Sequence, residues 1–261
     1  MQYVDVKIHG PVATVLMNHA DRRNTLSPRL IEDLQTAFGD VHQEKRVRAV
    51  ILSGAGDHFC AGIDLAVLDA IAKMPSPQAF DEFFNAWRRY ADLLETILRF
   101  PKPVIAAVDG SAVGAGLALA LAADIMIVSD RASLSAEAVR RGLVGGATAA
   151  LLSFRAGAAT AAKMLLTGET MDADEAYRRG VCEKPVPTEQ IWVAASDLAT
   201  RCSHAPREAV QATKRILNET IGEMLLTQIA AGIADSATAC STESAQEGVA
   251  AFLERRTPNW P

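Results

Sequence analysis

The sequence predicts an α/β fold in which strands dominate the first half of the chain and helices the second half. Short apolar stretches at residues 47–53, 104–108 and 125–129 are typical of buried strands. The first two are each followed by a glycine-rich turn and then by a helical pattern. From residue 149 onward, the pattern is mainly helical. A chain of 261 residues with 49% hydrophobic side chains can bury a substantial core.

The chain opens with a predicted β-hairpin. Residues 3–8 and 12–18 alternate apolar and polar side chains on either side of a His-Gly-Pro sequence. A helix is then expected to begin at Ser27-Pro28, because serine can cap a helix and proline fits its first position. The strand at 47–53 follows, and it ends in the glycines of residues 54–56.

The segment after the first buried strand contains a turn at 59–65 that leads into a helix. Residues 66–82 are expected to be rich in loops, because they contain Pro75 and Pro77. A long amphipathic helix is predicted over 83–100.

The second half of the chain is predicted to be a series of helices. Their expected bounds are 149–166, 172–180, 188–203, 206–218, 222–240 and 243–255. We therefore divide the chain into an α/β core at 1–200 and a C-terminal helical region at 201–261.

Composition and charge exclude several classes of function. The chain has 26 Lys and Arg against 31 Asp and Glu, a net charge of −5, which argues against nucleic acid as the main partner. The longest uncharged run of the apolar midsection, 110–123, is shorter than the roughly 20 residues of a membrane span. The four cysteines are widely spaced and form no metal-binding motif, so we expect reduced thiols, no metal and a cytoplasmic location.

Two glycine turns carry the main chemical signal. Ala61-Gly62 and Gly114-Ala115-Gly116 each precede a helix, whose first backbone N–H groups have no partner within the helix. Two such turns that converge on one point would form an oxyanion hole. Neither turn matches a phosphate-binding loop.

The residues around these turns resemble the crotonase, or enoyl-CoA hydratase/isomerase, superfamily. The resemblance is carried by FCAGIDL at 59–65 and PVIAAVDGSAVGAGLALALAADI at 103–125. LMNHADRRNTLS at 16–27 and STESAQEGVAAFLERRTPNW at 241–260 extend it through essentially the whole chain.

This resemblance implies a spiral of ββα turns that binds an acyl-CoA thioester, with coenzyme A as part of the substrate and no separate cofactor. The thioester carbonyl is expected between the backbone N–H groups of Ile63 and Ala115. The other residues that the resemblance places in substrate binding are Ala61, Gly62, Asp64, Leu65 and Gly114, with Ala118 and Ala138 at the acyl group. Arg22 and Arg23 correspond to the region that meets the coenzyme phosphates, although they also fit a solvated loop.

The acid–base residues depart from the family pattern. Hydratases of this family carry two glutamates that bracket the reacting carbons. The corresponding positions here are Ala118 and Ala138. Glu137 lies one residue too early, and in a helical turn this offset rotates a side chain by about 100°. A structural role and an acid–base role both remain open for Glu137.

The predicted function is therefore an acyl-CoA-processing enzyme that stabilises a thioester enolate, with hydration itself doubtful. An isomerase or decarboxylase with a non-standard base is one alternative. A non-catalytic acyl-CoA-binding protein is another, with an aliphatic pocket of Ala118, Ala138, Val139 and Leu143. The resemblance also implies a homotrimer or homohexamer, and Met224, Leu225, Ile229 and Ile233 form an apolar face that could mediate assembly.

Overall fold

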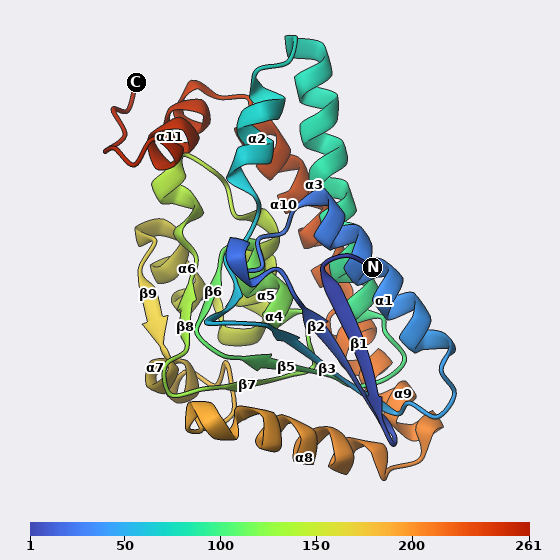
Figure 1. Ribbon diagram of the computed structural model, residues 1–261. Helices are drawn as coiled ribbons and strands as arrows, with labels where there is room; N and C mark the ends of the chain where they lie inside the picture. Colours follow the sequence, from blue (N-terminus) through green and yellow to red (C-terminus); the bar gives the residue numbers. More distant parts are fainter.

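The computed structural model describes residues 1–261, apart from the side chain of Ile221. Its strands form two sheets (Figure 1). The larger sheet has the order β1-β2-β3-β5-β7, in which β1 is antiparallel to β2 and the other neighbours are parallel. These strands span Val4–His9, Val12–Met17, Ala49–Gly54, Val104–Val108 and Ile125–Val128.

The smaller sheet has the order β4-β6-β8-β9, and only β9 is antiparallel to its neighbour. Its strands span His58–Cys60, Ser111–Val113, Ser133–Ser135 and Thr170–Asp172. The chain passes from β3 to β4, from β5 to β6 and from β7 to β8. Each pass therefore adds one strand to the larger sheet and one to the smaller sheet. Helices separate the passes, which confirms the predicted spiral of ββα turns.

The first helix begins where the sequence predicts. Helix α1 spans Pro28–Gln43, and the Ser27 hydroxyl caps it by accepting a hydrogen bond of 3.2 Å from the amide of Leu30. The strands of the predicted hairpin, β1 and β2, pair with His9 opposite Val12.

The expectation of a loop-rich segment at 66–82 is wrong. Helix α2 covers Leu65–Ala72 and helix α3 covers Ser76–Leu98, so only a short connection lies between them. Pro75 occupies the N-cap position and Pro77 lies in the first turn of α3. Proline is tolerated there because the first amides of a helix have no partner within the helix.

The second half is helical, as predicted, but with interruptions. Residues 149–166 form no single helix, because Gly157, at φ 80°, separates α5 from α6. The α-helix in the segment predicted at 206–218 ends at Arg215. A π-helical segment, Ile216–Ile221, follows it directly. The α-helices are α4 Ala115–Leu121, α5 Gly146–Ala156, α6 Ala158–Thr167, α7 Ala173–Arg178, α8 Ile191–Ser203, α9 Arg207–Arg215, α10 Glu223–Ala239 and α11 Glu243–Leu253. Among all residues described, no helix is both long and apolar enough to cross a membrane.

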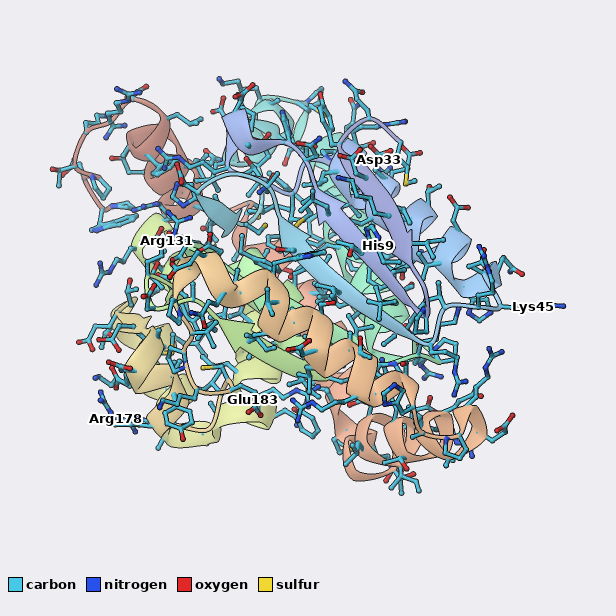
Figure 2. All side chains as sticks on the ribbon, turned by 60° about the horizontal axis from the view of Figure 1, so that its bottom comes forward. His9, Asp33, Lys45, Arg131, Arg178 and Glu183 are labelled. Atoms are coloured by element: carbon cyan, nitrogen blue, oxygen red, sulfur yellow. The ribbon has the colours of Figure 1, made fainter. Side chains whose placement is uncertain are left out.

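The larger sheet is covered on both faces. Helix α8 crosses one face, where Ala195 and Ala199 pack against Ile51 and Ile105 (Figures 1 and 2). Helices α1 and α4 contact the sheet on the other side, which belongs to the main core. Because the strands lie between two apolar layers, they appear in the sequence as continuous apolar runs.

The C-terminal helices pack on their own chain. Leu225, Ile229 and Ile233 are buried, and α10 contacts α3 and α5. Of the apolar face proposed for assembly, only Met224 is exposed, at 61%. These three buried residues therefore stabilise the monomer, and trimer or hexamer assembly stays a prediction.

Candidate active site

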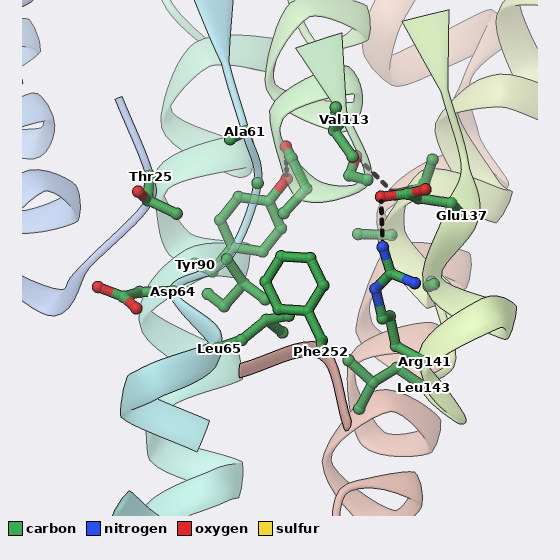
Figure 3. Close-up of a pocket in the computed structure, with 18 of the residues that line it drawn as sticks. Thr25, Ala61, Asp64, Leu65, Tyr90, Val113, Glu137, Arg141, Leu143 and Phe252 are labelled. Carbon is green, nitrogen blue, oxygen red and sulfur yellow. Dashed lines mark hydrogen bonds and ion pairs between the residues drawn. The ribbon is translucent and has the colours of Figure 1, made fainter. Parts of the chain in front are cut away.

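A cavity of about 250 Å³ lies where the two glycine turns meet (Figure 3). The turns contribute residues 61–66 and 113–115 to its wall. The segment 143–148, which leads into α5, and Phe252 at the end of α11 close the other side.

The first glycine turn presents the amide of Ile63. Leu26 and Ile63 form a parallel bridge, in which the amide of Leu26 donates to Gly62 O (2.7 Å) and Leu26 O accepts from the amide of Asp64 (3.3 Å). This pairing leaves the Ile63 amide on the opposite side of the strand. Within the described residues, that amide donates no hydrogen bond to the backbone.

The second glycine turn presents the amide of Ala115 at the first position of α4. The carbonyl of Gly114 accepts hydrogen bonds from Thr148 Oγ1 (3.1 Å) and from the amide of Ala118 (3.0 Å). Because the C=O and N–H of a trans peptide point in opposite directions, the Ala115 N–H points away from Thr148. It has no acceptor within the helix, since it belongs to the first turn.

The two turns are in close contact, and this contact requires glycine. A Cβ atom at Gly62 would lie 2.6 Å from Val113 O and 3.5 Å from the amide nitrogen of Ala115. A Cβ atom at Gly116 would overlap the carbonyl oxygen of Cys60. Glycine at 62 and 116 thus allows the two helix starts to approach, so that Ile63 and Ala115 line the same cavity.

Tyr90, a residue of α3, forms a hydrogen bond with the backbone of Ala115. Its hydroxyl donates a hydrogen bond of 2.5 Å to Ala115 O, and burial raises the pKa of this phenol well above its ordinary value. The hydroxyl is therefore a neutral donor. Thr148 and Tyr90 thus donate to the carbonyls of Gly114 and Ala115, which lie before and after the Ala115 amide in the chain. Sequence analysis had identified neither residue.

The carboxylates of the cavity wall are both ion-paired. Glu137 lies 3.3 Å from Arg141 Nη2, and the guanidinium of Arg141 stacks 4.6 Å above the centre of the Phe252 ring (Figure 3). Asp64 caps α2 by accepting from the amide of Ala66 (3.1 Å), and it contacts Arg22 at 3.3 Å. Asp64 thus organises the start of α2, whereas Glu137 lines the cavity just after β8.

The structure brings most of the predicted site residues together. The following line the cavity: Arg22, Arg23, Ala61, Gly62, Ile63, Asp64, Leu65, Gly114, Ala115, Glu137 and Ala138. Ala118 is fully buried in α4 and lies behind the wall. Val139 is 44% exposed, so of the expected aliphatic pocket only Ala138 and Leu143 face the cavity.

A cysteine thiol and possible metal ligands are the other reactive groups to consider near the site. Burial raises the pKa of the Cys60 thiol to about 12, so this thiol stays protonated at neutral pH. Within the part of the chain that the structure describes, no three His, Cys, Asp or Glu side chains gather as metal ligands would.

The fold, a spiral of ββα turns with a cavity between two glycine turns, is that of a class of enzymes that process acyl-CoA thioesters. The chain belongs to the enoyl-CoA hydratase/isomerase family, whose sequence profile matches residues 7–261. The 1,2-epoxyphenylacetyl-CoA isomerase of Escherichia coli is 30% identical over 100% of this chain and 98% of its own. Among solved structures, an enoyl-CoA hydratase from Mycobacterium avium superimposes with a TM-score of 0.87, at 29% identity and with complete coverage of both chains. An enoyl-CoA hydratase from Bacillus anthracis has a TM-score of 0.77 at 30% identity, with 99% of each chain covered.

Proposed function

We propose that this protein binds an acyl-CoA thioester with its carbonyl oxygen between the amides of Ile63 and Ala115, and that it stabilises the enolate. The observation that supports the proposal is that Ile63 and Ala115 both line one cavity, and that neither amide donates to a backbone acceptor among the described residues. One such donor contributes about 2.7–4 kcal/mol to a transition state with a developing oxyanion. The arginines at the mouth, Arg22 and Arg23, supply positive charge for the coenzyme phosphates.

The reaction that fits this site best is a proton shift within the acyl group. Glu137 and Ala138 both line the cavity, and of the two only Glu137 can transfer a proton. We therefore place the reacting carbons beside Glu137. In this scheme Glu137 takes a proton from the α-carbon and the electron pair moves to the thioester oxygen. The protonated Glu137 exchanges its proton with solvent and then gives a proton back to the α-carbon or to the γ-carbon. The net reaction is an isomerisation, which consumes no water. The name of the Escherichia coli relative, an isomerase, is consistent with this scheme.

Deuterium exchange tests this function directly. Incubation with 3-hexenoyl-CoA in D₂O should give deuterium at the α-carbon and 2-hexenoyl-CoA as product. Glu137→Gln should lower both rates by about 10²–10⁴-fold, because a positioned base contributes this much. The matched control is Glu32→Gln on the exposed face of α1, which should change neither rate. Unchanged exchange in Glu137→Gln would exclude Glu137 as the base.

A second candidate is an acyl-CoA-binding protein without turnover. The ion pair of Glu137 with Arg141 favours it, because a carboxylate held by a guanidinium has less freedom to reach a substrate. Binding of 3-hexenoyl-CoA without any deuterium exchange would select this candidate. An enolate-like CoA analogue that binds no more tightly than a saturated acyl-CoA would point the same way.

Loss of the groups that hold the second amide should weaken binding of an enolate-like analogue. Thr148→Val removes the hydroxyl that binds Gly114 O, and Tyr90→Phe removes the one that binds Ala115 O. Each should lower affinity for the analogue by about 3- to 10-fold, which corresponds to one hydrogen bond, and affect a saturated acyl-CoA less. Calorimetric titration measures both affinities. Thr238→Val, at an exposed position of α10, is the control, and equal loss for both ligands would contradict a positioning role.

A further inference from the structure

A second cavity of about 210 Å³ lies behind the first, between α2, α3, α10 and α11. Most of its lining is apolar and comes from Leu68, Ala72, Phe83, Ala245, Val249 and Ala250. Its polar edge is formed by Gln246 and by the Asp69–Lys73 ion pair (2.6 Å), in which Lys73 is 74% exposed. The apolar part therefore lies inside the protein, and the polar edge lies at the surface.

Leu143 separates the two cavities, since its side chain lines both. Trp87 belongs to the wall of the first cavity and donates a hydrogen bond from Nε1 to Cys240 Sγ (3.4 Å), which lines the second. The partition is thus about one side chain thick. Figure 3 shows Leu143 beside Arg141.

The backbone that carries Leu143 rests directly on α11. A Cβ atom at Gly248 would overlap the backbone of Arg141, and one at Gly142 would overlap the backbone of Ser244. This close approach holds the backbone of 141–143 in place. Between the two cavities, Leu143 is therefore a side chain that a substitution can shorten while these backbone contacts stay in place.

We propose that the second cavity takes the distal part of the acyl chain, so that the substrates are medium-chain acyl-CoA thioesters and Leu143 determines chain-length specificity. This inference rests on the proposed function, because that function places the thioester at Ile63 and Ala115. A straight alkyl chain that extends from there past Leu143 enters the apolar lining of the second cavity. The Asp69–Lys73 pair and Gln246 set the limit, because methylene groups gain nothing beside them.

The test compares the affinity of two unreactive ligands, butanoyl-CoA and decanoyl-CoA, by calorimetry. Burial of each further methylene raises affinity by up to about fourfold, so the natural protein should bind decanoyl-CoA about tenfold or more tightly than butanoyl-CoA. Ala250→Leu fills the second cavity alone and should lower this ratio about tenfold. Leu143→Ala removes the partition and should raise it. Ala209→Leu, at an exposed position of α9, is the matched control for the ratio.

The two variants act in opposite directions, so either one tests the inference if the other fails to fold. A ratio near one in the natural protein would overturn it, as would a ratio that Ala250→Leu and Leu143→Ala leave unchanged. Failure of the proposed function would look different. In that case no acyl-CoA would bind at all, or an enolate-like analogue would bind no better than butanoyl-CoA.

Discussion

Hydration of crotonyl-CoA by this protein should be slower by roughly 10⁴-fold or more than by a family hydratase with a glutamate at both acid–base positions. Each positioned acid or base contributes about 10²–10⁴-fold. The family resemblance assigns these two positions to Ala118 and Ala138, which cannot transfer a proton. Loss of the enoyl absorbance, followed side by side for the two enzymes, measures the difference.

A carboxylate restored at position 138 should recover part of this rate. Ala138 lines the cavity, so Ala138→Glu places a carboxylate beside the acyl group and should raise hydration by about 10²-fold. Ala209→Glu on the surface of α9 should leave the rate as it is. Hydration by the natural protein at the rate of ordinary hydratases would refute the prediction, and Glu137→Gln would then show whether Glu137 replaces the missing groups.

Removal of the Lys214 ammonium should destabilise the fold by roughly 3–5 kcal/mol, because it leaves a carboxylate without its buried partner. Lys214 Nζ lies 2.7 Å from Asp124 Oδ2 and also donates to the carbonyls of Ile97 (3.1 Å) and Lys102 (3.2 Å). Its side chain is 7% exposed. Lys214→Ala therefore also leaves two backbone carbonyls without this donor.

This cluster matters for the site because Asp124 anchors the chain just after α4, whose first residue is Ala115. Asp124 Oδ2 accepts from the amide of Val104 (2.8 Å) at the start of β5. Urea unfolding measures the stability of Lys214→Ala. The exposed pair of Lys163 with Glu169 is the control, since Lys163→Ala should cost less than about 1 kcal/mol. An equal, small loss in both variants would show that the buried pair contributes little.

Local sequence signals predicted the first half of the fold well. Ser27 caps α1 as expected, and the strands of the hairpin and of the larger sheet lie where apolar patterns placed them. These features depend on contacts within a few residues, or on burial of a whole strand, and both leave a regular pattern. The error at 66–82 arose because proline was interpreted as a breaker, whereas Pro75 and Pro77 begin a helix.

The two glycine turns that line the cavity were predictable from the sequence. The glycines of both turns carry a local signal. Gly62 and Gly114 have positive φ angles of 87° and 52°, which disfavour a side chain. A Cβ atom at Gly62 or Gly116 would also overlap the facing backbone. Tyr90 and Thr148 had no such signal. Each is an ordinary residue of a helix, and its role depends on a carbonyl that is distant in sequence.

By itself, the sequence determined the α/β class, the family and the two glycine turns, and it predicts that the acid–base positions of the family fall on Ala118 and Ala138. Those conclusions depend on residue type and spacing, which need no knowledge of distant contacts. Only the tertiary structure decided that Glu137 pairs with Arg141, that Ala118 lies behind the wall, and that Leu143 stands between two cavities. The physical reason is that ion pairs and cavities form between side chains from separate elements, and packing alone brings those elements together.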